Sequence, residues 1–354
     1  MLIGACTVLW LAAWIVHARL EAQGIASGFG FLWSRAGYDL SESLIPYSGN
    51  DSYARALLAG FSNTLKVAFC AIVAAILIGL LAATAQLSRH DLARGIGKFY
   101  VATIRNTPFL LQLFFWFGVF TISMPGPRTA LEPLPGLFIS NRGINFPWPS
   151  AFGWLVAAFI LCGLAGGLLL QLKKDKLNIG RLLPVLSMTA AVGVALVGFL
   201  SGWFQAEFPV AGAFSIKGGG QVSPEFLTLF TGLSVYTGSY IAEAIRGAVL
   251  AIPKGQIEAG SSLGLRPHHV LLLIIIPQAL RIALPAVVSE LLNLVKNSSL
   301  GVAVGYPELV SAGNTAMNQT GQAIELITIY MVVYVSFNFA ITRLFMFWER
   351  RHDR

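Results

Sequence analysis

The sequence predicts an all-α integral membrane protein with about eight transmembrane helices. Of its 354 residues, 56% are hydrophobic and only 11% are charged, whereas soluble domains contain about 25% charged residues. The hydrophobic residues form long continuous runs, and a helix needs about 20 such residues to cross a bilayer. A transmembrane barrel would instead show alternating segments of about ten residues. The expected elements are therefore helical spans.

Eight apolar runs are candidate spans, because each is long enough to cross or nearly cross the membrane. In chain order they are Leu2–Val16, Leu57–Ala85, Val101–Met124, Phe152–Leu172, Leu182–Phe204, Phe226–Leu250, Leu271–Val304 and Ala323–Phe347. The first run has a competing interpretation as a cleaved signal peptide, but a signal carries a basic segment before its apolar core and this run follows Met1 directly. We expect a spanning helix there, with a natural start upstream of Met1 or a trimmed chain.

Basic residues set the expected orientation. Lys and Arg cluster in four short segments between or after the runs, and the positive-inside rule makes such segments cytoplasmic. The clusters are Arg89, Arg94 and Lys98; Lys173, Lys174, Lys176 and Arg181; Arg246, Lys254, Arg266 and Arg281; and Arg343, Arg350, Arg351 and Arg354. Eight crossings then place both termini in the cytoplasm. The net charge of +8 forms no single patch, so no nucleic-acid partner is expected.

The sequence argues against several other functions. It contains no Gly-x-x-x-x-Gly-Lys-Ser/Thr phosphate loop. Its three cysteines lack metal-ligand spacing, and its five histidines are scattered rather than clustered as in a membrane enzyme. A secondary transporter would carry a pair of interrupted helices in inverted repeats, whereas one interrupted run is seen here. No catalytic residue, metal site or bound cofactor is expected in this chain.

One loop on the expected cytoplasmic face, residues 255–281, has a distinctive pattern. Residues 256–263 can form a short helix, and its small residues from Ala259 to Ser262 would let a partner surface approach closely. Gly264 permits the backbone conformation that ends a helix, and Pro267 can begin the next one. Such a helix suits docking in a groove of another protein. An ordinary helix-turn-helix connection is the alternative.

The same loop resembles the EAA loop of ABC importer permeases. In that loop Glu-Ala-Ala is followed three residues later by Gly and, after nine more residues, by Ile-x-Leu-Pro. The matching residues are Glu258, Ala259, Gly264, Ile274 and Pro277. Gly260 stands in place of the third-position Ala, and Ile276 in place of the Leu; both departures are mild.

Further motifs resemble the polar amino acid branch of these permeases and occur in the expected order from about Ala59 to Phe347. They are residues 240–247, 251–256, 277–281 and 296–300, and Arg105-Asn106-Thr107-Pro108 with Gln112. Within the branch the chain looks most like the general L-amino acid permease subunits, because of its extra first helix, its long segment 24–53 and its added helices at about 152–204. The resulting division is 1–58 (N-terminal helix and long periplasmic segment), 59–347 (permease domain) and 348–354 (cytoplasmic tail).

The resemblance implies a type I ABC importer permease core in the bacterial inner membrane. It implies pairing with a second, related permease subunit, two ABC ATPase subunits that use ATP and Mg, and a periplasmic amino acid-binding protein, all working in membrane lipid. The EAA helix would transmit closure of the ATPase dimer to the membrane helices. The coupling residues would be Glu258, Ala259, Gly260, Gly264 and Arg266.

Charged residues inside the spans also indicate function. A charge at mid-bilayer costs about 2.5–3.5 kcal/mol on insertion scales, so such a residue is expected to have a role that offsets this cost. The candidates for a substrate pathway are Glu290, Asn293, Lys296, Ser298 and Ser299. The alternative for Glu290 and Lys296 is that they only tie helices together. Related chains often carry Asp after this Lys, and here Asn297 follows it. Lys66 is expected to pack or snorkel, and Glu243 to pair with Arg246.

The seventh run should be broken rather than straight. Pro277 and Pro285 remove backbone donors, and Gly301 and Gly305 add freedom. Irregular backbone inside a membrane is tolerated where it faces protein or a water-filled cavity. We therefore expect this helix beside the translocation path. The motif from Arg105 to Pro108 is expected to begin the third span at its cytoplasmic end, either as a proline-marked helix start with a snorkelling Arg or with a role in coupling.

Overall fold

The structure is a computed structural model that describes residues 28–149, 206–212 and 215–352. The predicted spans Leu2–Val16, Phe152–Leu172 and Leu182–Phe204 lie outside the described residues. The chain divides into two compact units. The helical unit comprises the described residues up to Phe117 and those from Glu225 onward, and the second unit runs from Gly118 to Pro224.

Helix α2 (Tyr53–Leu87) confirms the predicted span at Leu57–Ala85. Ser52 caps it by accepting a hydrogen bond from the Arg55 backbone N–H. The side chains that α2 buries are mostly small, whereas large apolar side chains such as Phe69 and Leu81, each 71% exposed, point outward. Small residues between helices and large ones outside are typical of a helix in lipid.

The predicted third span is wrong at its start. Helix α3 (Asp91–Asn106) comes first, and α4 (Phe109–Gly118) follows and continues as a π-helical turn, Val119–Ser123. The two helices bend by 106°. The cause is Pro108, which disfavours helical backbone at the residue before it, and Thr107 is accordingly extended (φ −103°, ψ 127°).

The C-terminal half of the chain follows the sequence prediction closely. Its helices are α7 (Pro224–Leu250), α8 (Lys254–Ser262), α9 (Pro267–Val270), α10 (Ile276–Asn297), α11 (Leu309–Thr320) and α12 (Ala323–His352). The break expected in the seventh run is not found: Pro267–Val304 forms one helical span, in which only the helix type changes, with a π-helical stretch at Leu271–Ile275 before α10 and a 3₁₀ stretch at Ser298–Val304 after it. The helix continues through Pro285.

Within the described residues, three helices are long and apolar enough to cross a membrane, or four if the bent α3–α4 pair counts as one span. The three are Tyr53–Leu87, Pro267–Val304 and Ala323–Arg343. Helix α7 has 27 residues but is not among them, since hydroxyl groups and glycine dilute its apolar content. Many of its side chains, such as Leu229 and Ser239, are fully buried, which fits a helix inside the bundle. The count of eight spans stays a prediction.

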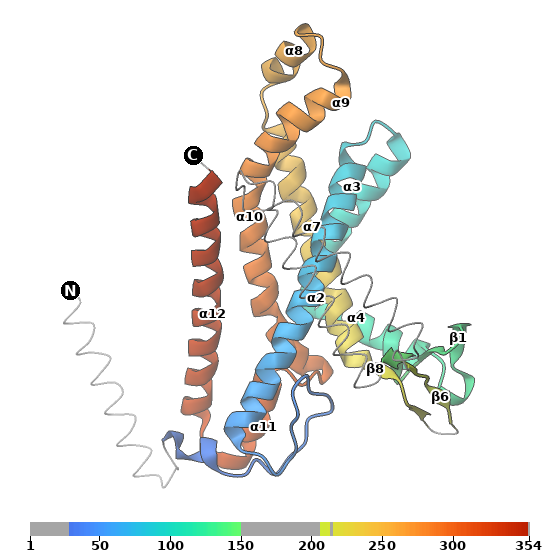
Figure 1. The fold of residues 1–354 in the computed structure, drawn as a ribbon, viewed down its shortest axis with the longest axis vertical. Helices are drawn as coiled ribbons and strands as arrows, with labels where there is room; N and C mark the ends of the chain where they lie inside the picture. Colours follow the sequence, from blue (N-terminus) through green and yellow to red (C-terminus); the bar gives the residue numbers. More distant parts are fainter. Residues whose placement is uncertain (1–27, 150–205, 213–214, 353–354) are drawn as a thin grey trace, which may run out of the picture. The chain divides into compact units, whose positions relative to one another are not determined.

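Two tight contacts hold the helical unit together. A Cβ at Gly60 would lie 2.9 Å from Ala312 Cβ, which allows α2 to pack closely on α11. A Cβ at Gly79 would lie 2.5 Å from Ile241 Cγ2, which brings α2 against α7. In Figure 1, α8 and α9 lie at one end of this unit and α11 lies at the other.

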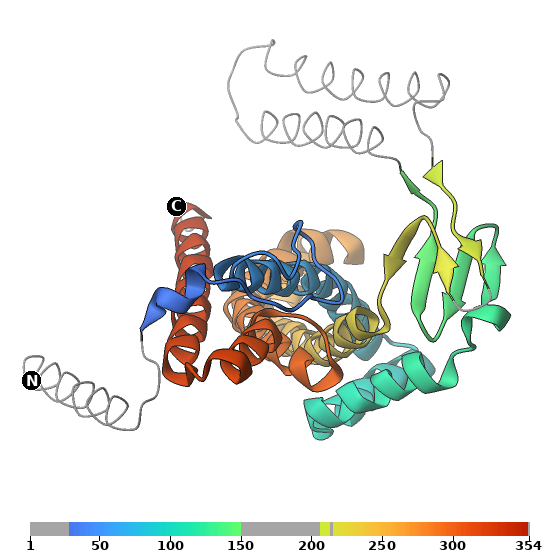
Figure 2. The ribbon, with the colours of Figure 1, turned by 90° about the horizontal axis from the view of Figure 1, so that it is seen from below.

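The second unit contains short strands, so the all-α expectation is too narrow. Four antiparallel strands form one sheet in the order β1-β2-β3-β8 (Figure 2); they are Leu131–Leu134, Leu137–Ser140, Gly143–Phe146 and Gly220–Val222. Two small ladders join β4 (Trp148–Pro149) to β5 (Ala206–Glu207) and β6 (Val210–Ala211) to β7 (Ile216–Lys217). Gly143 (φ +106°) is required where β3 meets β8, because a Cβ there would lie 2.0 Å from Val222 O.

Candidate functional site

The helix-turn at residues 254–266, which we call the coupling segment after the role predicted for it, presents four of its five predicted residues to solvent. Glu258 and Ala259 lie on the exposed surface of α8, and Gly264 and Arg266 follow in the exposed turn. Leu263, at the end of α8, is 82% exposed. An acidic group beside an unshielded leucine is a surface that another protein can cover.

Gly264 ends α8 in the way that the sequence predicts. Its φ is +76°, a conformation that costs little only for glycine. Its N–H donates to Ser261 O at 3.0 Å, and the Leu265 N–H donates to Gly260 O at 3.2 Å. These two bonds form a Schellman motif, which satisfies the last carbonyls of the helix. Pro267 then occupies the first turn of α9.

Gly260 does not lie on the docking surface that the sequence suggests for it. It is buried, and a Cβ there would lie 2.5 Å from Ile274 Cδ1 and 3.4 Å from Val270 Cγ2. The glycine therefore lets α8 fold back on the segment that follows it. This packing accounts for the departure from Ala at the third position of the EAA motif.

The predicted pathway residues divide into two groups. Glu290, Asn293 and Lys296 follow one another at three-residue spacing on α10, so they form one stripe on its surface. Asn293 and Lys296 are exposed and Glu290 is half-buried. Tyr236 of α7 lies within electrostatic reach of Glu290, so the stripe begins where α10 faces α7.

The two serines do not extend this stripe. Ser298 is fully buried and its hydroxyl donates to Val295 O at 2.7 Å, while the Ser299 hydroxyl donates to Lys296 O at 2.8 Å. Both serine hydroxyls thus donate to backbone carbonyls of the preceding helical turn. The Ser298 hydroxyl also lies beside Tyr334 of α12, away from the stripe.

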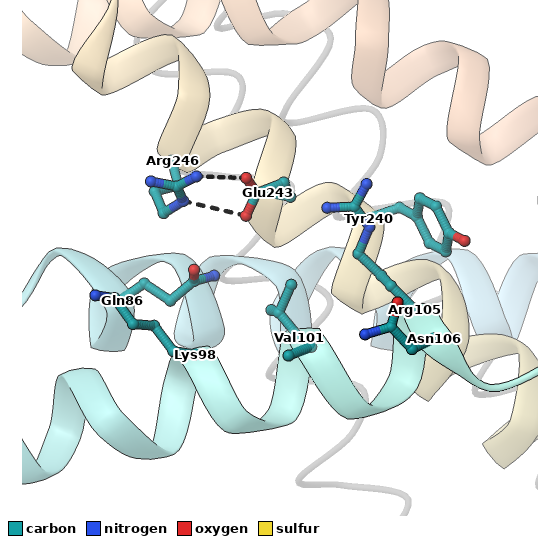
Figure 3. A pocket seen from close by; sticks show the side chains of 9 residues that line it. Gln86, Lys98, Val101, Arg105, Asn106, Tyr240, Glu243 and Arg246 are labelled. Atoms are coloured by element: carbon teal, nitrogen blue, oxygen red, sulfur yellow. Dashed lines mark hydrogen bonds and ion pairs between the residues drawn. The ribbon is translucent and has the colours of Figure 1, made fainter.

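A cleft of about 650 Å³ opens between α3 and α7 at the end of α2. Figure 3 shows its side chains, which are those of Gln86, Lys98, Val101, Ala102, Arg105, Asn106, Tyr240, Glu243 and Arg246. Arg246 donates to both carboxylate oxygens of Glu243, from Nε at 3.1 Å and from Nη2 at 2.5 Å, which confirms the predicted ion pair. The Glu243 carboxylate is therefore neutralised by Arg246. Lys98 and Arg105 leave the cleft with a net positive charge.

Glu308 was not anticipated by sequence reasoning. It is fully buried, and its carboxylate accepts hydrogen bonds from the N–H groups of Val310 (2.9 Å) and Ser311 (2.7 Å) at the start of α11. Burial raises the pKa of Glu308 to about 8, although these backbone bonds oppose the shift. The sequence predicts that Glu308 lies in a connection outside the membrane, where a charged side chain is normally exposed, so its burial could not be predicted.

A segment before α2, residues 34–52, lies over α2 and α11; we call it the N-terminal strap. Asn63, fully buried on α2, accepts from the Leu44 N–H at 3.0 Å and donates to Glu42 O and Pro307 O, both at 2.9 Å. Lys66 pairs with the Glu42 carboxylate at 3.2 Å. Its ammonium also lies 4.8 Å from the centre of the Phe226 ring. The Lys66 side chain therefore packs against Glu42 and Phe226, as predicted.

Comparison with known proteins shows which family has a similar sequence. The family model described as "Binding-protein-dependent transport system inner membrane component" matches residues 177–354. The chain is 41% identical over 347 residues to the General L-amino acid transport system permease protein AapQ of Rhizobium johnstonii, covering 95% of this chain and 86% of that protein. It is 37% identical over 362 residues to the Putative amino-acid ABC transporter permease protein YhdX of Escherichia coli, covering 99% and 92%.

A solved structure supports the fold. The crystal structure of an amino acid ABC transporter with histidines matches at a TM-score of 0.52 and 19% identity, covering 84% of this chain and 95% of that chain. At this identity the likeness speaks for the fold alone. It agrees with a type I ABC permease core built from mostly helical, membrane-spanning elements. With sequence identity extending over nearly its whole length, the chain belongs to the family of binding-protein-dependent transport system inner membrane components.

Proposed function

We propose that this chain is the permease subunit of an ATP-driven importer that carries amino acids across the bacterial inner membrane. The observation that carries the proposal is its end-to-end similarity to two permeases named for amino acid transport. The substrate class includes polar or general L-amino acids. Both termini and the coupling segment lie in the cytoplasm, and the strap lies on the periplasmic side.

The energy comes from other chains. Two ABC ATPase subunits bind and hydrolyse ATP with Mg, and they contact the exposed Glu258, Ala259, Gly264 and Arg266 of the coupling segment. Gly260 supports this surface from beneath by allowing α8 to fold back. A second, related permease subunit completes the pore, and a periplasmic binding protein delivers the amino acid.

The pathway for the amino acid passes the stripe on α10. Glu290, half-buried beside α7, can attract an ammonium group, and the exposed Lys296 can attract a carboxylate. Charged groups in a span are expected to mark a pathway or pair with one another. No ion pair involves Glu290 or Lys296 within the described residues, which supports the pathway role.

The proposal is tested by purifying the chain with its partner permease and ATPase subunits and measuring ATPase activity in proteoliposomes. We expect activity to rise when the amino acid-loaded binding protein is added. Glu258→Lys should abolish uptake and this stimulation while the complex still inserts and assembles, because the changed charge lies on the exposed docking surface. Lys254→Gln, at the exposed start of the same helix, is the matched control.

Two outcomes would contradict the proposal. Transport by this chain alone, driven by an ion gradient without ATPase subunits, would remove it from the importer class. Unchanged uptake in Glu258→Lys would leave the importer assignment standing but remove Glu258 from coupling.

A further inference from the structure

The cleft between α3 and α7 carries charges of both signs in a fixed order along its length. Figure 3 shows Arg105 toward one end, Glu243 in the middle and Lys98 toward the other end. The volume of about 650 Å³ lies within the range of about 300–1,000 Å³ that is usual for small-molecule sites. The cleft is therefore suited to a small molecule whose charges follow the opposite order.

Glu243 can bind a further cation in the middle of the cleft. Its carboxylate accepts two hydrogen bonds from Arg246, and a carboxylate offers about four acceptor positions. The Glu243 side chain is 29% exposed, so these remaining positions are accessible. An ammonium group can bind there without displacing Arg246.

Arg105 is held beside Glu243 without an ion pair of its own. Its guanidinium carbon lies 5.0 Å from the centre of the Tyr240 ring, and it lies within electrostatic reach of Glu243. No salt bridge involves Arg105 within the described residues. A cation–π contact orients the guanidinium and leaves its N–H donors free for a carboxylate. Together, Arg105 and Glu243 match the carboxylate and the ammonium of an α-amino acid.

The other end of the cleft supplies hydrogen-bond donors. Lys98 is exposed and forms no salt bridge in the part of the chain that the structure describes. Gln86 is 6% exposed, and its Nε2 has no hydrogen-bond partner among the described residues. A buried amide donor without an acceptor is costly. This end therefore suits a carboxylate or an amide oxygen, and Lys98 repels a cation.

Two tyrosines of α7 place the cleft next to the stripe on α10. Tyr236 lies within electrostatic reach of both Glu290 and Arg105. Its hydroxyl oxygen lies 3.2 Å from that of Tyr240, which is one helical turn nearer to α8. In the proposed orientation, an amino acid that leaves the stripe toward the cytoplasm meets this cleft next.

We propose that the cleft is a cytoplasmic-side binding site for an amino acid whose side chain ends in a carboxylate or an amide. Arg105 binds the α-carboxylate, Glu243 binds the ammonium group, and Lys98 with Gln86 binds the side-chain oxygen. The site rests on the proposed function and narrows its substrate class. Lysine and arginine are disfavoured here, because their side-chain cations would lie beside Lys98.

The test measures protection of a cysteine by ligand in the assembled transporter, in detergent and without native cysteines. Ala102→Cys places the thiol in the cleft lining, and Thr103→Cys places it at the next exposed position, outside the lining. We expect L-glutamine and L-glutamate to slow the reaction of Ala102→Cys with a small maleimide and to leave Thr103→Cys unchanged. L-lysine at the same concentration should protect neither position.

Substitutions separate the contacts with the backbone groups of the ligand from those with its side chain. R105Q should raise the half-protecting concentration about tenfold for both L-glutamate and L-leucine, since both have an α-carboxylate. K98Q should raise it about tenfold for L-glutamate and leave it unchanged for L-leucine, whose side chain has no acceptor. A loss of folding would affect both ligands alike. R89Q, which removes an exposed cation from the nearby α2–α3 connection, is the matched control and should change neither value.

Three results would overturn the proposal. Equal protection by L-lysine and L-glutamine would show that the side chain is not read. Equal protection by inorganic phosphate would identify a general anion site. Uptake of L-glutamine by the same complex without protection of Ala102→Cys would remove the site and leave the proposed function standing, whereas a complex that takes up no amino acid with its binding protein would contradict the proposed function itself.

Discussion

Gly260 and Gly264 are four residues apart in the coupling segment and have different roles. Gly260 gives space for close packing, because a Cβ there would lie 2.5 Å from Ile274 Cδ1, the flexible end of a side chain that would have to shift. Gly264 has open space around it but a φ of +76°. A sequence pattern predicts the second role, since a glycine after a short helix is typical of a C-terminal cap. It does not predict the first, because the partner lies in a later segment.

The cap makes a specific prediction. Gly264→Ala should weaken the end of α8 by about 1 kcal/mol, because alanine is strained in the left-handed region. Hydrogen exchange of peptides covering residues 254–266 should accelerate. Gly255→Ala is the control, since this glycine lies inside the helix with open space around it, and alanine there should slow exchange or leave it unchanged. Equal acceleration in both variants would contradict the Schellman role.

Glu308 makes stability depend on pH. Its pKa is about 8 in the folded protein and 4.5 for an unperturbed side chain, so the unfolded chain loses its proton at lower pH. The contribution of this group to the free energy of unfolding therefore falls as pH rises from about 4.5 to about 8, and is constant above that.

Glu308→Gln removes this titration while keeping an oxygen that can accept from the α11 backbone. We expect the Tm of the variant, relative to wild type, to increase between pH 5 and pH 9 in the same detergent, because only the wild type must bury a charge at high pH. Glu258→Gln, on the exposed surface of α8, controls for the loss of one carboxylate. A Tm difference for Glu308→Gln that is the same at both pH values would contradict the assignment.

At the scale of elements, spacing predicted the helices that carry a continuous apolar run or a clear cap. The span of α2, the short α8, and the start of α9 at Pro267 all follow from such signals. Helix α3 was missed because Arg94, Lys98 and Arg105 interrupt its apolar residues. In a sequence, basic residues at this spacing are typical of a connection between spans. In the folded chain they lie on a helix, and Lys98 and Arg105 line a cleft.

The strands and the strap escaped prediction for a different reason. Each strand is two to four residues long, too short for alternation to be recognised. The strap is fixed by side chains far away in sequence, such as Asn63, and not by its own pattern. The stripe of Glu290 and Lys296 was predictable because it depends only on local helix spacing; the burial of Ser298 was not.

The strap should loosen when Asn63 is shortened. Asn63→Ala leaves the Leu44 N–H and the Glu42 and Pro307 carbonyls without their side-chain partner, at a cost of about 1–3 kcal/mol for each buried group left unpaired. We expect a lower Tm and faster proteolysis within residues 34–52. Ser62→Ala is the matched control, because the Ser62 hydroxyl bonds only the Ala59 carbonyl of its own helix. Unchanged proteolysis in Asn63→Ala would contradict the role of the strap contacts.

At the scale of the whole molecule, small side chains mark the closest helix contacts of the helical unit, and many large apolar side chains are exposed. Alanine and glycine line the contacts of α2 with α7 and α11, whereas large apolar residues such as Phe339 of α12 are exposed. Lipid supplies no hydrophobic force between helices, so close packing of small residues must hold them together. Composition predicts the membrane environment, but only the fold shows that the coupling segment and the strap lie at opposite ends of this unit (Figure 1).

This separation predicts the result of labelling from one side of the membrane. In a variant without native cysteines, Asn50→Cys in the strap and Ser262→Cys at the end of α8 both place a thiol at an exposed position. A membrane-impermeant maleimide added to intact spheroplasts should label the strap cysteine and spare the α8 cysteine, because the basic segment around α8 is retained inside. Lysis should make both reactive. Labelling of both in intact spheroplasts, or of the α8 cysteine alone, would contradict the orientation on which coupling to a cytoplasmic ATPase depends.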